Sequence, residues 1–359
     1  MAKNEYVEPL FDVTEWIDHS TEIGYDFKWR CKKCGNEILS PPMHYPDRPI
    51  RCFTCYPANN VTSMLEIEIV DFIKSLSNEF EVVHRKQENR SFVPNREIDI
   101  VVKKNGKILL LIEVDGLYWH SMLCGKDKNY HLNKTEHCIR QGHQLIHIFE
   151  DEWTYHEDIV KSRLKNLLGI YDAVVFARKC SVVKLTSAEA KLFFNETHIQ
   201  GNTQSAIRYG LKYENEIVAA MSFGHRRKIT NGKRADGEYE LLRFSTKLGH
   251  HVVGAASRLL SHFERDYNPK KLLSYADKRW SIGKLYEALG FVLDHESSPN
   301  YWYMTSRCDR RLYRYGFRKS KLPMLLKSFD ANKTELENML DNGYNVIWDC
   351  GNYVFVKSY

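Results

Sequence analysis

The chain has 359 residues, which is enough for two or three domains. A hydrophobic share of 43% and an aromatic share of 13% indicate buried cores and exclude a largely disordered chain. The formal net charge of +6 is modest, and no run of about 18 apolar residues is present, so we expect a cytoplasmic protein with no membrane partner. Nine cysteines, four of them in two C-x-x-C pairs, favour a metal site in a reducing compartment over a disulfide framework.

The first motif is a set of four cysteines within residues 29–57. Two C-x-x-C pairs are separated by a spacing typical of a four-thiolate zinc site. So short a segment has little core of its own, so the metal would supply its folding free energy. We therefore predict a structural zinc ribbon at 29–60 after an N-terminal segment, 1–28. Its ligands would be Cys31, Cys34, Cys52 and Cys55.

Residues 61–77 are predicted to form a helix that opens at Ser63. Glu66 follows Ser63 by three residues, which is the spacing of a capping box. The alternative interpretation is that Glu66, or Glu68, points into an acidic site. A strand is expected next, at 80–84.

Two further strands carry acids where a buried sheet should not have them. An Asn-Gly turn at 104–107 predicts a hairpin that joins the strand bearing Asp99 to the strand bearing Glu113 and Asp115. Alternation places Glu113 and Asp115 on one face and Val114 on the other. Since an unpaired buried charge is costly, these carboxylates must be paired, protonated or bound to metal. An oxygen-rich set of this kind suits Mg²⁺, whereas solvated strand ends are the alternative.

The elements that follow complete an α/β unit. A helix is expected around 129–141, ending at Gly142, then a strand at 143–149 and a helix ending at Gly169. The predicted order is therefore helix, three strands, helix, strand, helix.

This order, with acids on the second and third strands, resembles the PD-(D/E)XK nuclease fold. The phrases IEVDGLYWHS and GHQLIHIFEDEW resemble its very-short-patch-repair branch, and more closely the phage homing endonucleases of the EDxHD type, which commonly carry a zinc ribbon ahead of the nuclease. The similarity covers roughly residues 29–170. It implies an αβββαβ nuclease domain at 61–171 that cuts double-stranded DNA with Mg²⁺, in the host cytoplasm if the protein is phage-encoded.

The resemblance also implies roles for individual residues. Glu66 matches the acid of the first helix, Asp99 the invariant strand acid and Glu113 the acid of the E-x-K motif, so Asp99 and Glu113 would bind magnesium. The lysine of that motif is replaced by Asp115, which departs from the family pattern.

Two histidines are candidates for the role of the lysine that this motif lacks. His120 matches the histidine after tryptophan, and His131 falls where related nucleases carry an acid. Either could act as general base or contact the phosphate, because histidine titrates near neutrality. The alternative for His131 is simple packing or exposure to water.

After a bridge at 172–182, the region 183–359 resembles the GNAT acetyltransferase fold, and within it the phage Mom-type DNA-modification proteins. In that fold a Q/R-x-x-G-x-G/A loop at a helix N-terminus holds the pyrophosphate of coenzyme A (CoA). His251, Gly254 and Ala256 match the loop, with histidine replacing glutamine or arginine. The same loop could simply cap a helix. We expect acyl-CoA to be an unlikely cofactor and the domain to bind DNA.

Two other features of this region stand out. Tyr275, Asp277, Arg279 and Trp280 form its most chemically loaded cluster, and residues 341–357 read as a closing strand pair.

Residues 301–330 are strongly basic. They hold eight lysines and arginines against Asp309 and Asp330, interleaved with tyrosines. Such a cluster is a candidate phosphate-contacting surface, and a solvated basic face is the alternative. The residues predicted to contact DNA are Arg307, Arg310, Arg311, Arg314, Arg318, Lys319 and Lys321.

The sequence as a whole therefore predicts a multi-domain α/β protein: a zinc ribbon, a nuclease domain and a GNAT-like α+β domain. The predicted activity is magnesium-dependent, site-specific hydrolysis of phosphodiester bonds in duplex DNA. Two alternatives remain open, a DNA-modifying acyltransferase whose nuclease-like half binds DNA, and a non-enzymatic zinc-dependent DNA-binding protein.

Overall fold

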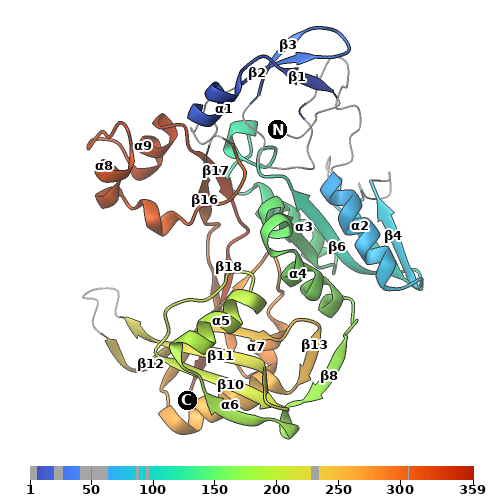
Figure 1. Cartoon of the computed structure of the whole chain (residues 1–359). Helices are drawn as coiled ribbons and strands as arrows, with labels where there is room; N and C mark the ends of the chain where they lie inside the picture. Colours follow the sequence, from blue (N-terminus) through green and yellow to red (C-terminus); the bar gives the residue numbers. More distant parts are fainter. Residues whose placement is uncertain are drawn as a thin grey trace. The chain divides into compact units, whose positions relative to one another are not determined.

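A computed structural model of the chain describes residues 6–19, 27–40, 50, 64–85, 89, 91–93, 97–227, 234–305 and 307–359 (Figure 1). It divides into two compact units. The first unit comprises 1–64, 117–126 and 301–347, and the second comprises 65–116, 127–300 and 348–359. The domain boundaries proposed from the sequence remain predictions.

The first unit contains a small antiparallel sheet in the order β1-β2-β3. Alternating residues of β2 point inward, because Phe27, Trp29 and Cys31 are buried while Lys28 and Arg30 are exposed. The elements are β1 (Val7–Pro9), α1 (Val13–His19), β2 (Phe27–Cys31) and β3 (Glu37–Ser40).

The C-terminal part of the first unit pairs β16 with β17, and short helices lie between them in sequence. The predicted strand pair at 341–357 is wrong, because β17 pairs with β16 whereas β18 inserts between β14 and β15. The bounds are η2 (Met122–Cys124), β16 (Tyr301–Met304), η4 (Arg314–Phe317), η5 (Lys319–Lys321), α8 (Leu322–Leu325), α9 (Glu335–Asp341) and β17 (Asn345–Trp348).

The second unit holds a four-stranded sheet in the order β4-β5-β6-β7, with β6 and β7 parallel. The predicted order of elements is observed, and Asn105 and Gly106 form the hairpin turn with positive φ, as Asn-Gly favours. The elements are α2 (Met64–Leu76), β4 (Phe80–His84), β5 (Ile100–Lys104), β6 (Lys107–Asp115), α3 (Tyr130–Arg140), β7 (Leu145–Phe149) and α4 (Glu150–Leu167).

A second, seven-stranded sheet has the order β15-β18-β14-β12-β11-β10-β9. Figure 1 labels its strands β10, β11, β12 and β18. Glu214 and Asn215 turn the predicted β10–β11 hairpin with positive φ. The strands are β9 (Ser181–Lys184), β10 (Ile207–Tyr213), β11 (Glu216–Arg227), β12 (Arg234–Thr246), β14 (Lys271–Asp277), β15 (Val292–Glu296) and β18 (Asn352–Ser358).

Helices and a small strand pair accompany this sheet. Leu259, Leu260 and Phe263 of α6 are buried in the core that the helix shares with β10 and β11. The elements are β8 (Ala173–Phe176), η3 (Ala177–Lys179), α5 (Ser187–Thr197), β13 (His250–Val253), α6 (Ala255–Tyr267) and α7 (Lys284–Ala288), with β13 parallel to β8.

The parallel pair β12–β14 is short. The two strands pair only from Glu238↔Lys271 to Leu241↔Ser274. Beyond that point the next residues of β12 pair with β11, and those of β14 pair with β18. The sheet therefore divides along its length at Leu241 and Ser274, and α6 lies in the connection between the two strands.

The predicted mixed α/β class is confirmed by these sheets and helices. Within the described ranges, every helix is too short or too polar to cross a membrane.

Candidate active site

The carboxylate of Glu113, a predicted magnesium ligand, is buried in an ion pair. Lys134 of α3 donates a hydrogen bond from Nζ to Glu113 Oε2, and a second at 3.1 Å to the carbonyl of Glu97. Only 1% of Glu113 and 5% of Lys134 is exposed. Burial, and then Asp99, raise the pKa of Glu113 well above its ordinary value, while Lys134 acts in the opposite direction. The helix after the acidic strands thus provides the countercharge within the protein.

Asp115 is bound to a histidine of the neighbouring strand. Its Oδ2 lies 2.9 Å from Nδ1 of His147, and Nε2 of His147 lies 2.9 Å from Thr135 Oγ1. The chain of contacts ends at Cys350 Sγ, 3.3 Å from the threonine hydroxyl. Burial lowers the pKa of His147 to about 4, so this imidazole is neutral at physiological pH.

The two histidines singled out from the sequence lie in different units. His131 is buried in the second unit, with Nε2 at 3.5 Å from Asp115 Oδ1 and Nδ1 at 2.7 Å from the carbonyl of Trp348. His120 is half-buried in a turn of the first unit, just before η2.

Glu66 is held by β4 and the residue after it. Arg85 donates to both oxygens, at 2.7 Å from Nε and 2.6 Å from Nη2, and His84 Nε2 lies 2.9 Å from Oε2. A bidentate arginine makes two charge-assisted hydrogen bonds, which are stronger than bonds between neutral groups. Ser63, the other half of the predicted capping box, lies outside the described residues.

Asp99 is half-buried immediately before β5. Its Oδ2 accepts a hydrogen bond from the backbone N–H of Val114 at 2.9 Å. This bond ties the acid to β6, between the two acids of that strand. Each of the four predicted acids therefore has at least one hydrogen-bond partner within the protein, although Oε1 of Glu113 has none among the described residues.

Half of the predicted zinc ligands can be located. Cys31 is buried at the end of β2, and Cys34 is exposed in the turn between β2 and β3. Cys52 and Cys55 lie outside the described residues.

The predicted DNA-contacting residues lie between β16 and α8 in the first unit. Arg310, Arg314, Arg318, Lys319 and Lys321 are exposed. Arg307 and Arg311 are half-buried. Arg314 is partly neutralised, because its Nε donates to Glu335 of α9 at 2.9 Å.

The loop predicted to bind a pyrophosphate leads into α6. Gly254 is the residue before the helix and has φ of +78°, a conformation that glycine adopts without strain. Ala256 is buried against the core, and His251 is exposed and stacks on Tyr171 with ring centroids 4.4 Å apart. The helix start is therefore built as predicted, with the histidine side chain against tyrosine.

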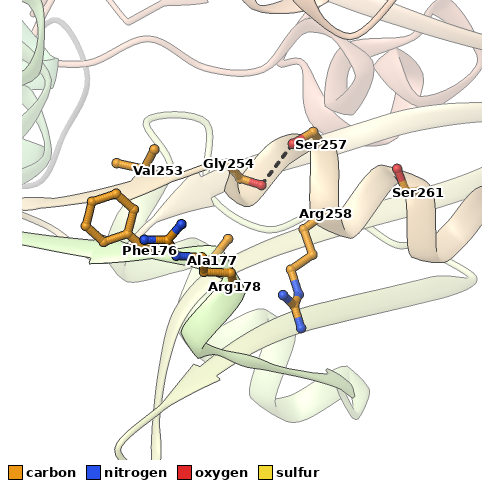
Figure 2. A pocket seen from close by; sticks show the side chains of 8 residues that line it. All are labelled: Phe176, Ala177, Arg178, Val253, Gly254, Ser257, Arg258 and Ser261. Carbon is orange, nitrogen blue, oxygen red and sulfur yellow. Dashed lines mark hydrogen bonds between the residues drawn. The ribbon is translucent and has the colours of Figure 1, made fainter.

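A pocket of about 510 Å³ adjoins this helix start (Figure 2). Arg178 of η3 and Arg258 of α6 lie on its wall, and Arg258 is oriented by a 3.0 Å hydrogen bond from Nη2 to the carbonyl of Cys180. Two cations beside the N-terminal end of a helix are suited to an anionic group. The lining is completed by Phe176, Ala177, Val253, Gly254, Ser257 and Ser261.

Most of the residues that line this pocket were not predicted from the sequence. Arg178 falls in the segment interpreted as a bridge, and only its pairing through β8 and β13 brings it to α6. Ser257, Arg258 and Ser261 could have been noticed, because three polar residues at this spacing after Gly254 share one side of a helix.

A second group of polar side chains lies where the β12–β14 ladder ends. Glu240 pairs with Leu273, so Glu240, Leu273 and Tyr275 share one face of the sheet. Glu240 is close enough to Tyr275 to contribute to raising its pKa, after burial. Burial also raises the pKa of Glu240, which brings this carboxyl closer to the range of a general base.

The opposite face presents Tyr286 of α7. Ser274 Oγ lies 3.2 Å from its hydroxyl, which in turn lies 3.4 Å from the carbonyl of Tyr275. Burial raises the pKa of Tyr286 above its ordinary value, so the hydroxyl keeps its proton. A proton donor and a candidate base thus lie on opposite faces of the same ladder end.

The other members of the predicted cluster, at the end of β14 and just after it, make contacts within the protein core. Arg279 is 2% exposed and bonds to Asp277 at 2.8 Å and to Glu152 of α4 at 3.0 Å. Trp280 is buried in the core of the four-stranded sheet, with the Arg163 guanidinium 4.6 Å from its ring. This segment joins the two sheets of the second unit.

No family model and no curated protein matches the chain. Solved structures similar to it include a GNAT acetyltransferase from Elizabethkingia anophelis with acetyl-CoA bound, 13% identical, covering 50% of this chain and 99% of that one at a TM-score of 0.28. An acetyltransferase from Bacillus subtilis in complex with CoA is 11% identical, with 50% and 99% coverage and a TM-score of 0.29. Naa50 of Arabidopsis thaliana, in complex with a CoA-peptide bisubstrate analogue, is 10% identical with the same coverage and TM-score as the B. subtilis enzyme.

These findings correct the predicted identity. The assignment to PD-(D/E)XK homing endonucleases of the EDxHD type is wrong, because the predicted catalytic acids are engaged by protein groups. The prediction of a magnesium-dependent DNA endonuclease, a phosphodiester hydrolase, is wrong for the same reason.

The cofactor prediction is corrected as well. It named Zn²⁺ and Mg²⁺ and described acyl-CoA as unlikely, whereas the similar structures contain acetyl-CoA, CoA or a CoA conjugate. The prediction moved away from CoA because position 251 is a histidine and because the same loop could simply cap a helix.

Proposed function

We propose that the seven-stranded sheet of the second unit is an acyltransferase that uses acyl-CoA. The observation that carries the proposal is the ladder between β12 and β14, which ends at Leu241 and Ser274. Its connection contains a helix that starts just after Gly254, beside two arginines. An extended ligand with amide groups can take the place of strand pairing at such a division, and the pantetheine arm of CoA is such a ligand.

The phosphate end of CoA fits the arginine pocket. Its phosphates are anionic, and Arg178 and Arg258 flank the start of α6, where backbone N–H groups and the helix dipole favour negative charge. Ser257 adds a hydroxyl from the first turn of the helix.

The reactive end would meet its acceptor where the ladder ends. An acceptor amine attacks the thioester carbonyl, the new C–N bond forms, the C–S bond breaks, and the thiolate takes up a proton. Glu240 is placed to accept the proton of the amine from one face, and Tyr286 to supply a proton to the sulfur from the other. The acyl donor and the acceptor would therefore approach from opposite faces of the sheet.

Binding of CoA to the full chain tests the first half of the proposal. Isothermal titration calorimetry should show saturable binding, and Arg178→Gln with Arg258→Gln should weaken it by about tenfold or more, since each loses a charge-assisted phosphate contact. Arg265→Gln is the matched control, because Arg265 is an exposed arginine of the same helix that does not line the pocket. Absence of binding by the parent at millimolar CoA would refute the proposal.

Thiol release from acetyl-CoA, followed with a thiol-reactive dye over a panel of amine acceptors, tests the second half. Tyr286→Phe should lower the rate by about a hundredfold while CoA affinity is retained, because only the proton donor is lost. An equal loss of affinity and rate in this variant would assign the tyrosine to packing instead.

A further inference from the structure

The basic region of the first unit contains a continuous series of cations and aromatic rings. The Arg311 guanidinium lies 5.2 Å from the Trp302 ring, and the Trp302 and Tyr313 ring centroids are 5.4 Å apart. Tyr313 and Tyr315 are 6.4 Å apart, and the guanidinium of Arg318 lies 4.0 Å from the Tyr315 ring. We call these five residues the Arg–aromatic ladder.

The outer rings of the ladder are open to solvent. Tyr313 is 63% exposed and Tyr315 is 59% exposed, although the rings Tyr301 and Tyr303 nearby are buried. A tyrosine that only packs a core would bury its ring, as those two do. The ladder thus begins against the protein at Trp302 and ends in solvent.

The charge around these rings is mostly positive. Between residues 301 and 330 eight lysines and arginines oppose two aspartates. Arg310, Arg318 and Lys321 are exposed, so this charge reaches the surface that carries the rings. Cationic groups that alternate with exposed rings match a polyanion whose backbone carries phosphates and whose bases can stack.

We propose that the Arg–aromatic ladder binds single-stranded nucleic acid. Unpaired bases stack on Tyr313 and Tyr315, and Arg318 with the neighbouring lysines contacts phosphates. A duplex hides the faces of its bases, so it could use only the charges and would gain nothing from the exposed rings. The proposal stands apart from the acyltransferase assignment, because it rests on residues of the other unit and on binding alone.

Fluorescence anisotropy of the full chain with a labelled oligothymidylate of about 20 nucleotides tests the proposal. Tyr313→Ala with Tyr315→Ala should raise the dissociation constant roughly tenfold or more, whereas Tyr315→Phe, which keeps the ring, should retain the parent affinity. Tyr155→Ala is the control, since Tyr155 on α4 is 51% exposed and lies in the other unit. Circular dichroism of each variant checks that it is folded.

The salt dependence of the affinity distinguishes the contribution of the cations from that of the aromatic rings. Arg318→Gln should reduce the slope of log affinity against log salt by about 0.7 for one lost phosphate contact, and the tyrosine variants should leave that slope unchanged. Tighter binding of a duplex of the same length would overturn the proposal. Equal binding of poly-glutamate, unaffected by the tyrosine variants, would also overturn it and show a surface for acidic peptides.

Discussion

The two sheets of the second unit place their charged residues in opposite ways. In the four-stranded sheet, Glu113 and Asp115 lie inside the core and are bound to Lys134 and His147. Beside the seven-stranded sheet, the cations Arg178 of η3 and Arg258 of α6 line a pocket at the start of a helix. Both sets are unusual in a sequence, but only the second remains accessible to a ligand. Exposure and partners, more than residue type, distinguish a binding site from an internal network.

The largest expected effect comes from removing the cation that joins the two sheets. Arg279→Met leaves Glu152 buried and Asp277 without its guanidinium partner, so the free energy of unfolding should fall by about 5 kcal/mol. Urea denaturation of the full chain measures this change. A fall below about 1 kcal/mol would show that water replaces the arginine at little cost.

The next effect concerns the ion pair inside the four-stranded sheet. Lys134→Met should cost about 4 kcal/mol near neutral pH, because Glu113 keeps its burial and loses its countercharge. Adding Glu113→Leu should recover much of that loss, since an apolar pair needs no charge compensation. If the double variant is no more stable than the single one, Glu113 has a role that the ion pair does not explain.

A third expectation is a pH dependence due to His147. Its pKa is near 6.5 when unfolded and about 4 when folded, so the unfolded state binds more protons between these values. Stability is therefore lost as pH falls from 6.5 to 4, by about 3 kcal/mol for this group. Asp349, whose pKa burial raises to about 6, acts in the opposite direction between its unfolded value and pH 6.

The difference between the parent and His147→Gln isolates the contribution of the histidine. The variant should lose less stability than the parent over this pH range, as measured by urea denaturation at several pH values. Parallel pH profiles would contradict a neutral buried imidazole.

The smallest expected effect is at the pocket. Gly254→Ala should cost about 1 kcal/mol, because φ of +78° strains an alanine while the nearest atom to its Cβ, on Ala177, would be at an ordinary 3.8 Å. Gly316→Ala is the control, since that glycine has neither a positive φ nor a neighbour within 4 Å. Thermal unfolding resolves this difference. An equal change in both variants would remove the argument from backbone strain.

Most local helices and turns could be predicted from the sequence, whereas the partners of the buried acids could not. Periodicity located α3, and the Asn105-Gly106 and Glu214-Asn215 turns set their hairpins, because these signals reside in neighbouring residues. Lys134 lies 21 positions from Glu113, and their pairing depends on how α3 packs on β6. A motif of acids therefore resembled a metal site until their partners in the fold were known.

The same limit explains what was missed in the candidate active site. Gly254 and Ala256 were recognised from their spacing, as a local loop can be. Arg178 comes close to them through the parallel pairing of β8 with β13. The strands β9 to β12 lie between these two strands in the sequence. No local pattern encodes that approach.

The segment after β14 determines whether the two sheets of the second unit can be separated from each other. Trp280 packs in the core of the four-stranded sheet, and the backbone N–H of His147 donates to the carbonyl of Arg279 at 3.2 Å. A fragment cut at the bridge near residue 172 would carry this tryptophan and arginine away from the groups that surround them. The two sheets are thus unsuited to exchange between genes as separate modules, and an expression fragment that begins at the bridge should aggregate.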